Sequence, residues 1–292
     1  MSRTEQEIHS QPQVWARAFE LTGQARELLV APGEQVLAIG CGTSAYMAAS
    51  YARLREAAGA GPTDAAYASE LPPSRRYDRL VAISRSGTTT EVLQALRGGR
   101  LADRTVGVTA VTRVAFDDLV DQRLVLDFAD ESSVVQTRFP TTLLALVRAA
   151  LGADPDRLVS DCRRAVEQPL PADPTRFHHF VFLGTGWTVG LADEAALKIR
   201  EAAQAWSESY PAMEYRHGPI AVADARSLVW MFGEPPTGLV DQVRARGATV
   251  VTSRLDPLAQ LVLAQRLAVA LAQARGLDPD RPRALTRSVI LQ

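Results

Sequence analysis

Two glutamates and one lysine between positions 194 and 201 have the types and spacing that suit proton transfer. Glu194 precedes Lys198 by four residues and Glu201 follows it by three, so a helix places all three side chains on one face. A carboxylate can take a proton from one carbon and return it to the next, while an ammonium can polarise a neighbouring oxygen. Lys198 is the only lysine among 32 Lys and Arg residues, so a position where arginine served equally well is expected to hold arginine. A solvated ion pair on the helix surface is the alternative.

Two loops rich in Gly, Ser and Thr follow apolar stretches and precede helical ones. They are Gly42–Ser44 and Ser84–Thr90. Hydroxyls and backbone N–H groups at the start of a helix can surround a phosphate, because that end of a helix carries partial positive charge. One such loop alone is more often a simple helix cap. Two loops that end parallel strands are expected to converge on one phosphate.

The elements that position these residues alternate along the chain. Apolar runs typical of buried strands lie at 36–39, 80–83, 106–111, 124–128, 181–184 and 228–231, with helical stretches between them. This alternation predicts an α/β fold with parallel sheets, because parallel strands need crossover connections that are usually helical. The functional loops are then expected at the carboxyl ends of the strands.

The strand–loop–helix pattern occurs twice. Leu37–Gly42 is matched by Val181–Gly186 at an offset of 144 residues, and Leu80–Ile83 by Leu228–Met231 at an offset of 148. Two matches in the same order predict two similar domains in tandem, and a general likeness between α/β domains is the alternative. The expected boundaries are N-terminal helices at 1–30, a first domain at 31–153, a linker at 154–177, a second domain at 178–280 and a tail at 281–292.

The two copies differ in the loop that follows the second matched strand. The first copy has the hydroxyl-rich sequence Ser84–Thr89, whereas the aligned stretch Phe232–Thr237 has lost most hydroxyls and gained a glutamate. Only the first copy is therefore expected to bind phosphate.

These motifs resemble those of sugar-isomerase (SIS) domains. The loops at 39–44 and 83–89 are similar to SIS phosphosugar loops, and the Ser-Arg-Ser-Gly form to the ketose/aldose isomerase and aminosugar-phosphate deaminase branch. Glu194–Glu201 and Glu214–Pro219 resemble the isomerase half of glucosamine-6-phosphate synthase, as do the beginning and the end of the chain. The resemblance implies two flavodoxin-like, three-layer SIS domains with parallel sheets, in tandem.

The resemblance also implies catalytic roles. Glu201 moves the proton between C1 and C2 of an opened sugar through an enediol or enolamine, and Lys198 polarises a sugar oxygen or holds the glutamate. His217 is the candidate for moving the ring-oxygen proton, because an imidazole can both donate and accept a proton. It is expected to reach the site from the neighbouring subunit, which implies a homodimer with shared active sites.

A set of substrate-binding residues follows from the same resemblance. They are Gly42, Thr43, Ser44, Ser84, Arg85, Ser86, Gly87, Thr89, Ser133 and Gln136. The synthase has a serine at the place of Gln136, so the sugar contacts are expected to differ. It has a lysine at the place of Arg287. A guanidinium stays charged and forms no imine, so Arg287 is expected to be an electrostatic or tail-anchoring residue.

Composition limits the other function classes. The net charge of −1 shows no basic excess, so no nucleic-acid partner is expected. The sequence predicts no membrane partner and no signal segment, and hence a cytoplasmic location. Two cysteines and four histidines without ligand-like spacing predict neither a disulfide framework nor a metal site, and no organic cofactor is expected. The SIS match starts at once, so no glutamine hydrolysis is expected.

These observations predict a phosphosugar aldose–ketose isomerase that acts on an aminosugar phosphate, with the release of ammonia or an amine left open. One alternative is a fructosamine-phosphate deglycase, which would use the same glutamate with a larger leaving amine. The other is a phosphosugar-sensing module without catalysis. The lack of a recognisable output domain and the complete Lys–Glu–His set favour the enzyme.

Overall fold

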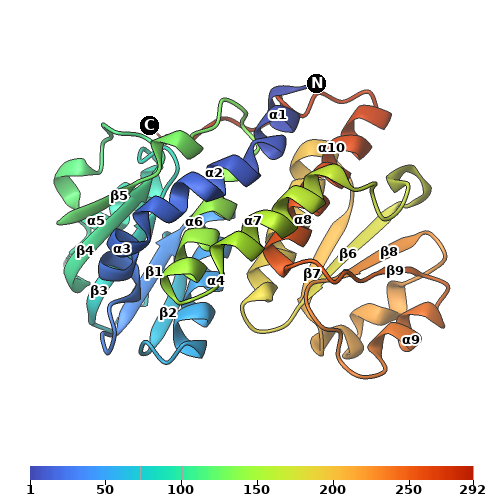
Figure 1. The fold of residues 1–292 in the computed structure, drawn as a ribbon, viewed down its shortest axis with the longest axis horizontal. Coiled ribbons are helices and arrows are strands. Elements are labelled where there is room, and N and C mark those ends of the chain that lie inside the picture. Colours follow the sequence, from blue (N-terminus) through green and yellow to red (C-terminus); the bar gives the residue numbers. More distant parts are fainter. Residues whose placement is uncertain (73, 100, 292) are drawn as a thin grey trace. The chain divides into compact units, whose positions relative to one another are not determined.

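The structure is a computed structural model that describes residues 1–292 except 73, 100 and 292 (Figure 1). The described residues form two compact units, each with its own parallel sheet. The sheet A unit comprises Ser10–Ser132, Arg138–Val159 and Thr286–Gln292. The sheet B unit comprises Met1–His9, Ser133–Thr137 and Ser160–Leu285. The α/β class with parallel sheets is therefore confirmed.

Sheet A, blue to green in Figure 1, has the strand order β2-β1-β3-β4-β5 in the described part of the chain, and all neighbouring strands are parallel. The strands are β1 (Val36–Gly40), β2 (Thr63–Tyr67), β3 (Tyr77–Ile83), β4 (Ala102–Thr109) and β5 (Gln122–Val125). This is the flavodoxin-like order, whose connections reverse direction between β1 and β3. The loops that end these two neighbouring strands therefore lie side by side, at the switch point where such folds bind ligands.

Helices cover both faces of sheet A. Leu37 and Ile39 of β1 belong to one core cluster with Val92 and Ala95 of α5, while α4 packs on β1 and β2 and is backed by α6. The regular helices are α2 (Gln11–Ala18), α3 (Thr22–Ala25), α4 (Thr43–Ala57), α5 (Thr90–Arg97) and α6 (Arg138–Ala150). Shorter turns are η1 (Phe19–Leu21), η2 (Arg26–Val30), η3 (Asp117–Leu119) and η4 (Asp127–Ala129).

Sheet B has the order β7-β6-β8-β9 among the described residues, which repeats the first four positions of sheet A. Its strands are β6 (His179–Gly184), β7 (Ser207–Pro211), β8 (Ser227–Met231) and β9 (Thr249–Val251). Its helices are α1 (Arg3–His9), α8 (Thr188–Ala203), α9 (Leu239–Arg244) and α10 (Pro257–Ala274), with the turns η5 (Pro174–Arg176), η6 (Glu214–Arg216) and η7 (Pro219–Val222). α8 packs on β6 and β7 and is backed by α10.

The first strand of each sheet ends in a glycine that lets the next helix approach closely. A Cβ on Gly40 would lie 2.5 Å from the backbone carbon of Ser44, and one on Gly184 would lie 2.3 Å from the backbone oxygen of Thr188. Only glycine fits at such contacts. The two glycines are separated by the 144-residue offset seen in the sequence. This agreement accords with an internal repeat, which stays a prediction.

Three strands and one helix were not predicted. β2, β7 and β9 are edge strands, and they are partly exposed, so no continuous apolar run marks them. The predicted linker at 154–177 contains helix α7 (Pro155–Glu167), whose Leu158 and Cys162 side chains are buried. The linker expectation missed this helix because Gly152 precedes it, Pro155 is its first residue and prolines follow it. The predicted domain boundaries otherwise stay a prediction.

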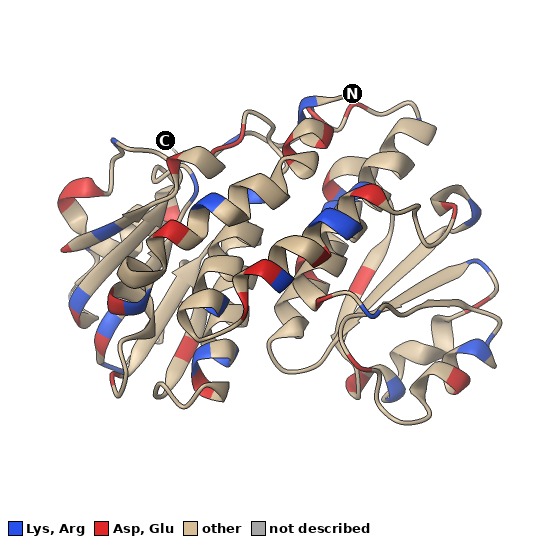
Figure 2. Cartoon of the chain, in the orientation of Figure 1, with Lys and Arg blue, Asp and Glu red and all other residues tan. Residues whose placement is uncertain are grey.

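The distribution of charged and apolar residues in the structure agrees with the near-neutral, mixed composition of the sequence. Acidic and basic residues are interspersed along the outer helices of each unit (Figure 2). Among the described residues, α10 alone is long and apolar enough to be considered a membrane span, with a mean hydropathy of 1.2. Because 72% of that helix is buried inside the structure, it has the features of a core helix.

Candidate functional site

The loop between β1 and α4 presents the first group of predicted ligand residues. Gly42 has a φ of +52°, a conformation that favours glycine and turns the chain directly from the strand into the helix. Thr43 and Ser44 form the first turn of α4 and are only 3% and 4% exposed. The positive end of the α4 dipole therefore faces this loop.

The loop between β3 and α5 presents the second group. Ser84 Oγ accepts a hydrogen bond from the N–H of Gly87 at 3.1 Å and lies 3.4 Å from Thr89 Oγ1. Thr89 is the N-cap residue of α5, yet its hydroxyl makes no capping bond to the helix. The hydroxyl of Thr89 therefore does not serve as a simple helix cap. The turn between these residues contains Gly87, which has a φ of +62°, and a Cβ there would lie 2.5 Å from Val114.

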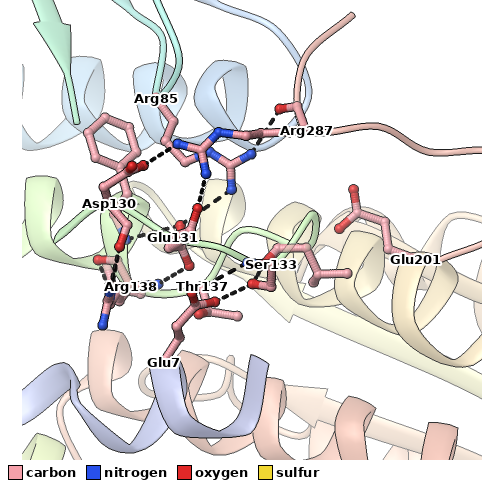
Figure 3. Close-up of polar contacts among 12 residues, drawn as sticks. Glu7, Arg85, Asp130, Glu131, Ser133, Thr137, Arg138, Glu201 and Arg287 are labelled. Atoms are coloured by element: carbon pink, nitrogen blue, oxygen red, sulfur yellow. Dashed lines mark hydrogen bonds and ion pairs between the residues drawn. The ribbon is translucent and has the colours of Figure 1, made fainter. Parts of the chain in front are cut away.

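Arg85 lies in this loop, but its guanidinium is buried among protein groups (Figure 3). Nη1 lies 3.8 Å from Oε2 of the fully buried Glu131, and Nη2 donates to the backbone oxygen of Arg287 at 2.8 Å. Arg287 in turn donates to the backbone oxygen of Glu131 and lies 2.5 Å from the Asp130 carboxylate. A buried guanidinium needs such partners because an uncompensated buried charge is strongly destabilising. Arg85 therefore connects the loop to the C-terminal segment.

The helix α8 holds Glu194, Lys198 and Glu201 together. Lys198 Nζ lies 3.2 Å from Glu194 Oε1 and 2.5 Å from Glu201 Oε2. The side chains of Lys198 and Glu194 are 1% and 0% exposed, whereas that of Glu201 is 19% exposed. The alternative of a solvated surface pair is therefore excluded for Lys198 and Glu194. Glu201 is the member of the group that can meet a ligand from solvent.

Burial and charge act in opposite directions on Lys198. Burial disfavours the ammonium, but Glu194 and Glu201 outweigh that effect and hold the pKa of Lys198 above its ordinary value of 10.5. Lys198 is therefore charged at neutral pH. It can stabilise negative charge on an oxygen, but it offers no free amine that could form an imine.

His217 lies at the end of η6, directly before Gly218, whose φ of +134° is a conformation that favours glycine. Its backbone N–H donates to Glu214, and its side chain is exposed. Met213 and Val222 nearby along the chain are 52% and 62% exposed. Single exposed apolar side chains are normal on a protein surface and do not by themselves indicate a partner. The cross-subunit role of His217 stays a prediction.

The predicted sugar contacts Ser133 and Gln136 lie in the sheet B unit and differ in their surroundings. Ser133 is 1% exposed, and its hydroxyl donates to the carboxylate of Glu7. Gln136 is partly exposed, and its buried Oε1 has no hydrogen-bond partner among the described residues. An unsatisfied buried oxygen is destabilising. Gln136 is therefore the better candidate of the two for a ligand contact.

The sequence placed Glu131 at the start of the segment 131–137 that contains Ser133 and Gln136, but assigned no role to Glu131 or to Asp130. They follow η4, the short turn after β5, and a sequence signal was their position past the carboxyl end of a parallel strand, where functional groups gather in such folds. Glu131 lies against Arg85, and Asp130 lies against Arg287, which is 202 residues from Arg85 along the chain. Such contacts between distant residues cannot be read from local sequence.

No protein-family model matches the chain. It is 29% identical, over 349 residues, to the glutamine–fructose-6-phosphate aminotransferase (isomerizing) of Aeropyrum pernix. It is 30% identical, over 362 residues, to that of Pseudomonas aeruginosa. Each match covers 98% of this chain. The chain is a homologue of these aminotransferases. It spans 57% and 58% of their lengths.

Solved structures also resemble this chain along almost its whole length. Glucosamine-6-phosphate deaminase from Thermotoga maritima matches with a TM-score of 0.85 and 28% identity, over 99% of this chain and 100% of that one. Tagatose-6-phosphate ketose/aldose isomerase from Escherichia coli matches with a TM-score of 0.80 and 20% identity, over 100% and 96% of the two chains, and this likeness concerns the fold. The resemblance to SIS proteins inferred from the sequence is confirmed.

Proposed function

We propose that this chain isomerises a six-carbon aminosugar phosphate and releases ammonia through an enolamine intermediate. The observation that carries the proposal is the pair on α8, in which a buried, charged Lys198 lies 2.5 Å from a partly exposed Glu201. A carboxylate held beside a fixed cation is suited to moving a proton between neighbouring carbons, because the cation can stabilise the oxyanion that forms.

The proposed reaction balances with water as the second reactant. The hydroxyl loop Ser84–Thr89 binds the phosphate. Glu201 removes the proton from C2 of the open aldehyde, and the electron pair forms the C1–C2 double bond of the enolamine. Lys198 stabilises the charge on the C1 oxygen. Glu201 then returns the proton to C1, and the proton that the nitrogen loses as the C2 imine forms passes to the C1 oxygen. Water then adds to the imine carbon and ammonia leaves, which gives the ketose phosphate.

Deamination is proposed in addition to isomerisation because of the 28% identity to the Thermotoga maritima deaminase. We further propose that the two units are tandem SIS domains in a cytoplasmic homodimer, with His217 serving the partner's site. The repeated strand order supports the tandem arrangement, and the exposed imidazole supports the role of His217 in a partner's site.

The decisive experiment compares wild type with Glu201→Gln on glucosamine 6-phosphate in D₂O, followed by NMR. Wild type is expected to place deuterium at C1 of the product, and the variant to lose turnover by roughly 10²- to 10⁴-fold with little change in affinity, because the amide cannot accept the carbon-bound proton. The matched control is Glu214→Gln, an exposed glutamate of the same unit, which should retain activity. Wild-type exchange in Glu201→Gln would assign the base to another residue.

The same assay separates the rival functions. Turnover of fructosamine 6-phosphate but not of glucosamine 6-phosphate would identify a deglycase. Tight binding of hexose or aminosugar 6-phosphates by the wild type, with no exchange and no product, would identify a sensing module.

A further inference from the structure

A cavity of about 340 Å³ lies between α5 and the segment that follows β2, within the sheet A unit. This volume is within the range of roughly 300–1,000 Å³ that is typical of small-molecule sites. On the helix side, the lining residues Glu91, Gln94 and Ala95 are three and four positions apart, so their side chains share one face of α5. One wall of the cavity is therefore a helix face with fixed geometry.

Most of the cavity wall is apolar. Ala68 and Ala95 belong to the core cluster of sheet A, and the partly buried side chains of Leu71 and Leu101 pack against that cluster. Apolar surface of this kind favours a ligand with an apolar body, because removing such surface from water is favourable. A sugar, which carries a hydroxyl group on almost every carbon, does not match these walls.

Glu91 supplies the only charge among the described residues that line this cavity. Its Oε2 is buried and has no hydrogen-bond partner in the described part of the chain. An acidic residue in the first turn of a helix is stabilised by the helix dipole, which would explain an exposed glutamate. Burial of a carboxylate oxygen without a donor is nevertheless costly, and a cation beside the carboxylate would offset that cost. The cavity is therefore complementary to a cation.

We propose that this cavity binds a small organic ammonium ion, with its apolar body against Leu71 and Leu101 and its charge beside Glu91. A primary ammonium has three N–H donors, and the amide oxygen of Gln94 on the same helix face can accept one of them. The described residues that line the cavity include none of those assigned to the sugar phosphate. The ammonium site is therefore separate from the proposed sugar site.

The charge of Glu91 also acts on one of the two predicted phosphate loops. Burial is the larger cause and this charge the smaller one that raise the pKa of Cys41, which lies directly before Gly42, to about 11. Glu91 also lies two positions after Thr89, the N-cap residue of α5. A negative charge there disfavours a phosphate dianion, so an ammonium at Glu91 should favour phosphate binding. This coupling rests on the proposed phosphosugar function, whereas the binding of an ammonium does not.

The site is tested by calorimetric titration of the full chain with benzylamine, a primary ammonium at neutral pH, and with benzyl alcohol, which has the same shape and no charge. The amine is expected to bind at least about tenfold more tightly, because charge-assisted hydrogen bonds are the stronger ones. Glu91→Gln should abolish this preference. The matched control Glu70→Gln should keep it, because Glu70 is exposed after β2 and does not line the cavity. Equal binding of the two ligands by the wild type, or an unchanged preference in Glu91→Gln, would overturn the proposal.

The Cys41 thiol gives a second readout that needs no sugar phosphate. Saturating benzylamine should lower the pKa of this thiol and accelerate its reaction with a disulfide reagent at fixed pH, because the ammonium offsets the charge of Glu91. Glu91→Gln should accelerate the reaction without any amine. Cys162 does not interfere, since it is fully buried and its pKa is also raised by burial. An unchanged or lower rate with benzylamine would contradict the placement of the ammonium beside Glu91.

The coupling is measured by titrating glucosamine 6-phosphate into the wild type with and without benzylamine. We expect about threefold to tenfold tighter binding in the presence of the amine, and the sugar phosphate should tighten amine binding by the same factor. In Glu91→Gln the amine should have no effect on the sugar phosphate. Equal affinity in both wild-type titrations would overturn the coupling. If no sugar phosphate binds at all, the proposed function fails, and the amine titration and the thiol rate still decide whether the cavity is an ammonium site.

Discussion

Replacing Lys198 by methionine removes the cation beside a fully buried carboxylate. Glu194 is 0% exposed and lies 3.2 Å from Lys198 Nζ. Methionine fills a similar space without the charge. Removing one partner of a buried ion pair typically destabilises a protein by about 3–5 kcal/mol, because the remaining charge is uncompensated. We expect Lys198→Met to lower the free energy of unfolding of the sheet B unit by about this amount at pH 7.

The difference in the free energy of unfolding between Lys198→Met and wild type should also change with pH in a definite direction. In the wild type the pKa of Lys198 is raised above 10.5, so its stabilising contribution is complete below that pH and is lost only as the pH rises through the raised value. In the variant, protonation of Glu194 removes the uncompensated charge. The deficit of Lys198→Met relative to wild type should therefore shrink as the pH falls from 7 toward 5.

The assay is urea unfolding followed by tryptophan fluorescence, which reports mainly on the sheet B unit because it contains Trp187, Trp206 and Trp230. The double variant Glu194→Gln/Lys198→Met carries no buried charge at this pair and should regain much of the lost stability, which a double-mutant cycle measures. A loss below about 1 kcal/mol in the single variant, or a loss that does not change with pH, would refute the reasoning.

Three further predictions concern ligand binding, assembly and the thiol. Ser86→Ala should weaken binding of glucosamine 6-phosphate about 10- to 100-fold, as measured by calorimetry, because a hydrogen bond to a charged group is worth about 1.5–3 kcal/mol. Thr237→Ala in the aligned loop of the second copy should leave the affinity unchanged. Equal effects of the two substitutions would contradict phosphate binding by one copy only. Mixing inactive Glu201→Gln and His217→Ala chains should restore activity at roughly a quarter of the sites if the histidine crosses the dimer. Mass spectrometry must first show subunit exchange, and no recovery after that would place both residues in one chain's site. Burial is the larger cause and the charge of Glu91 the smaller one that together raise the pKa of Cys41 to about 11. Cys41 should therefore react with a disulfide reagent at pH 8 at least about tenfold more slowly than glutathione does, because the thiolate is the reactive form. An equal rate would contradict this prediction.

The sequence predicted those parts of the fold that depend on local pattern. β1, β3, β6 and β8 are central strands buried on both faces, so each appears as a short apolar run. The edge strands β2, β7 and β9 carry no such run and could not be recognised. Helix spacing likewise predicted that Glu194, Lys198 and Glu201 share a face, because three- and four-residue separations are neighbours on any α-helix.

Only the tertiary structure decided the surroundings of those residues. Nothing in the spacing on α8 distinguishes a solvated pair from a buried one, and the burial of Lys198 and Glu194 comes from the packing of α8 against β6, β7 and α10. The loop sequence placed Arg85 beside the predicted phosphate, but its side chain turns to Glu131 and to the backbone of Arg287, 202 residues away along the chain. Local sequence sets which groups are available, whereas contacts between distant segments set which of them are buried, charged and already engaged. The hydroxyls of Ser86 and Thr88 show this directly, because their partner Ser288 comes from the other end of the chain.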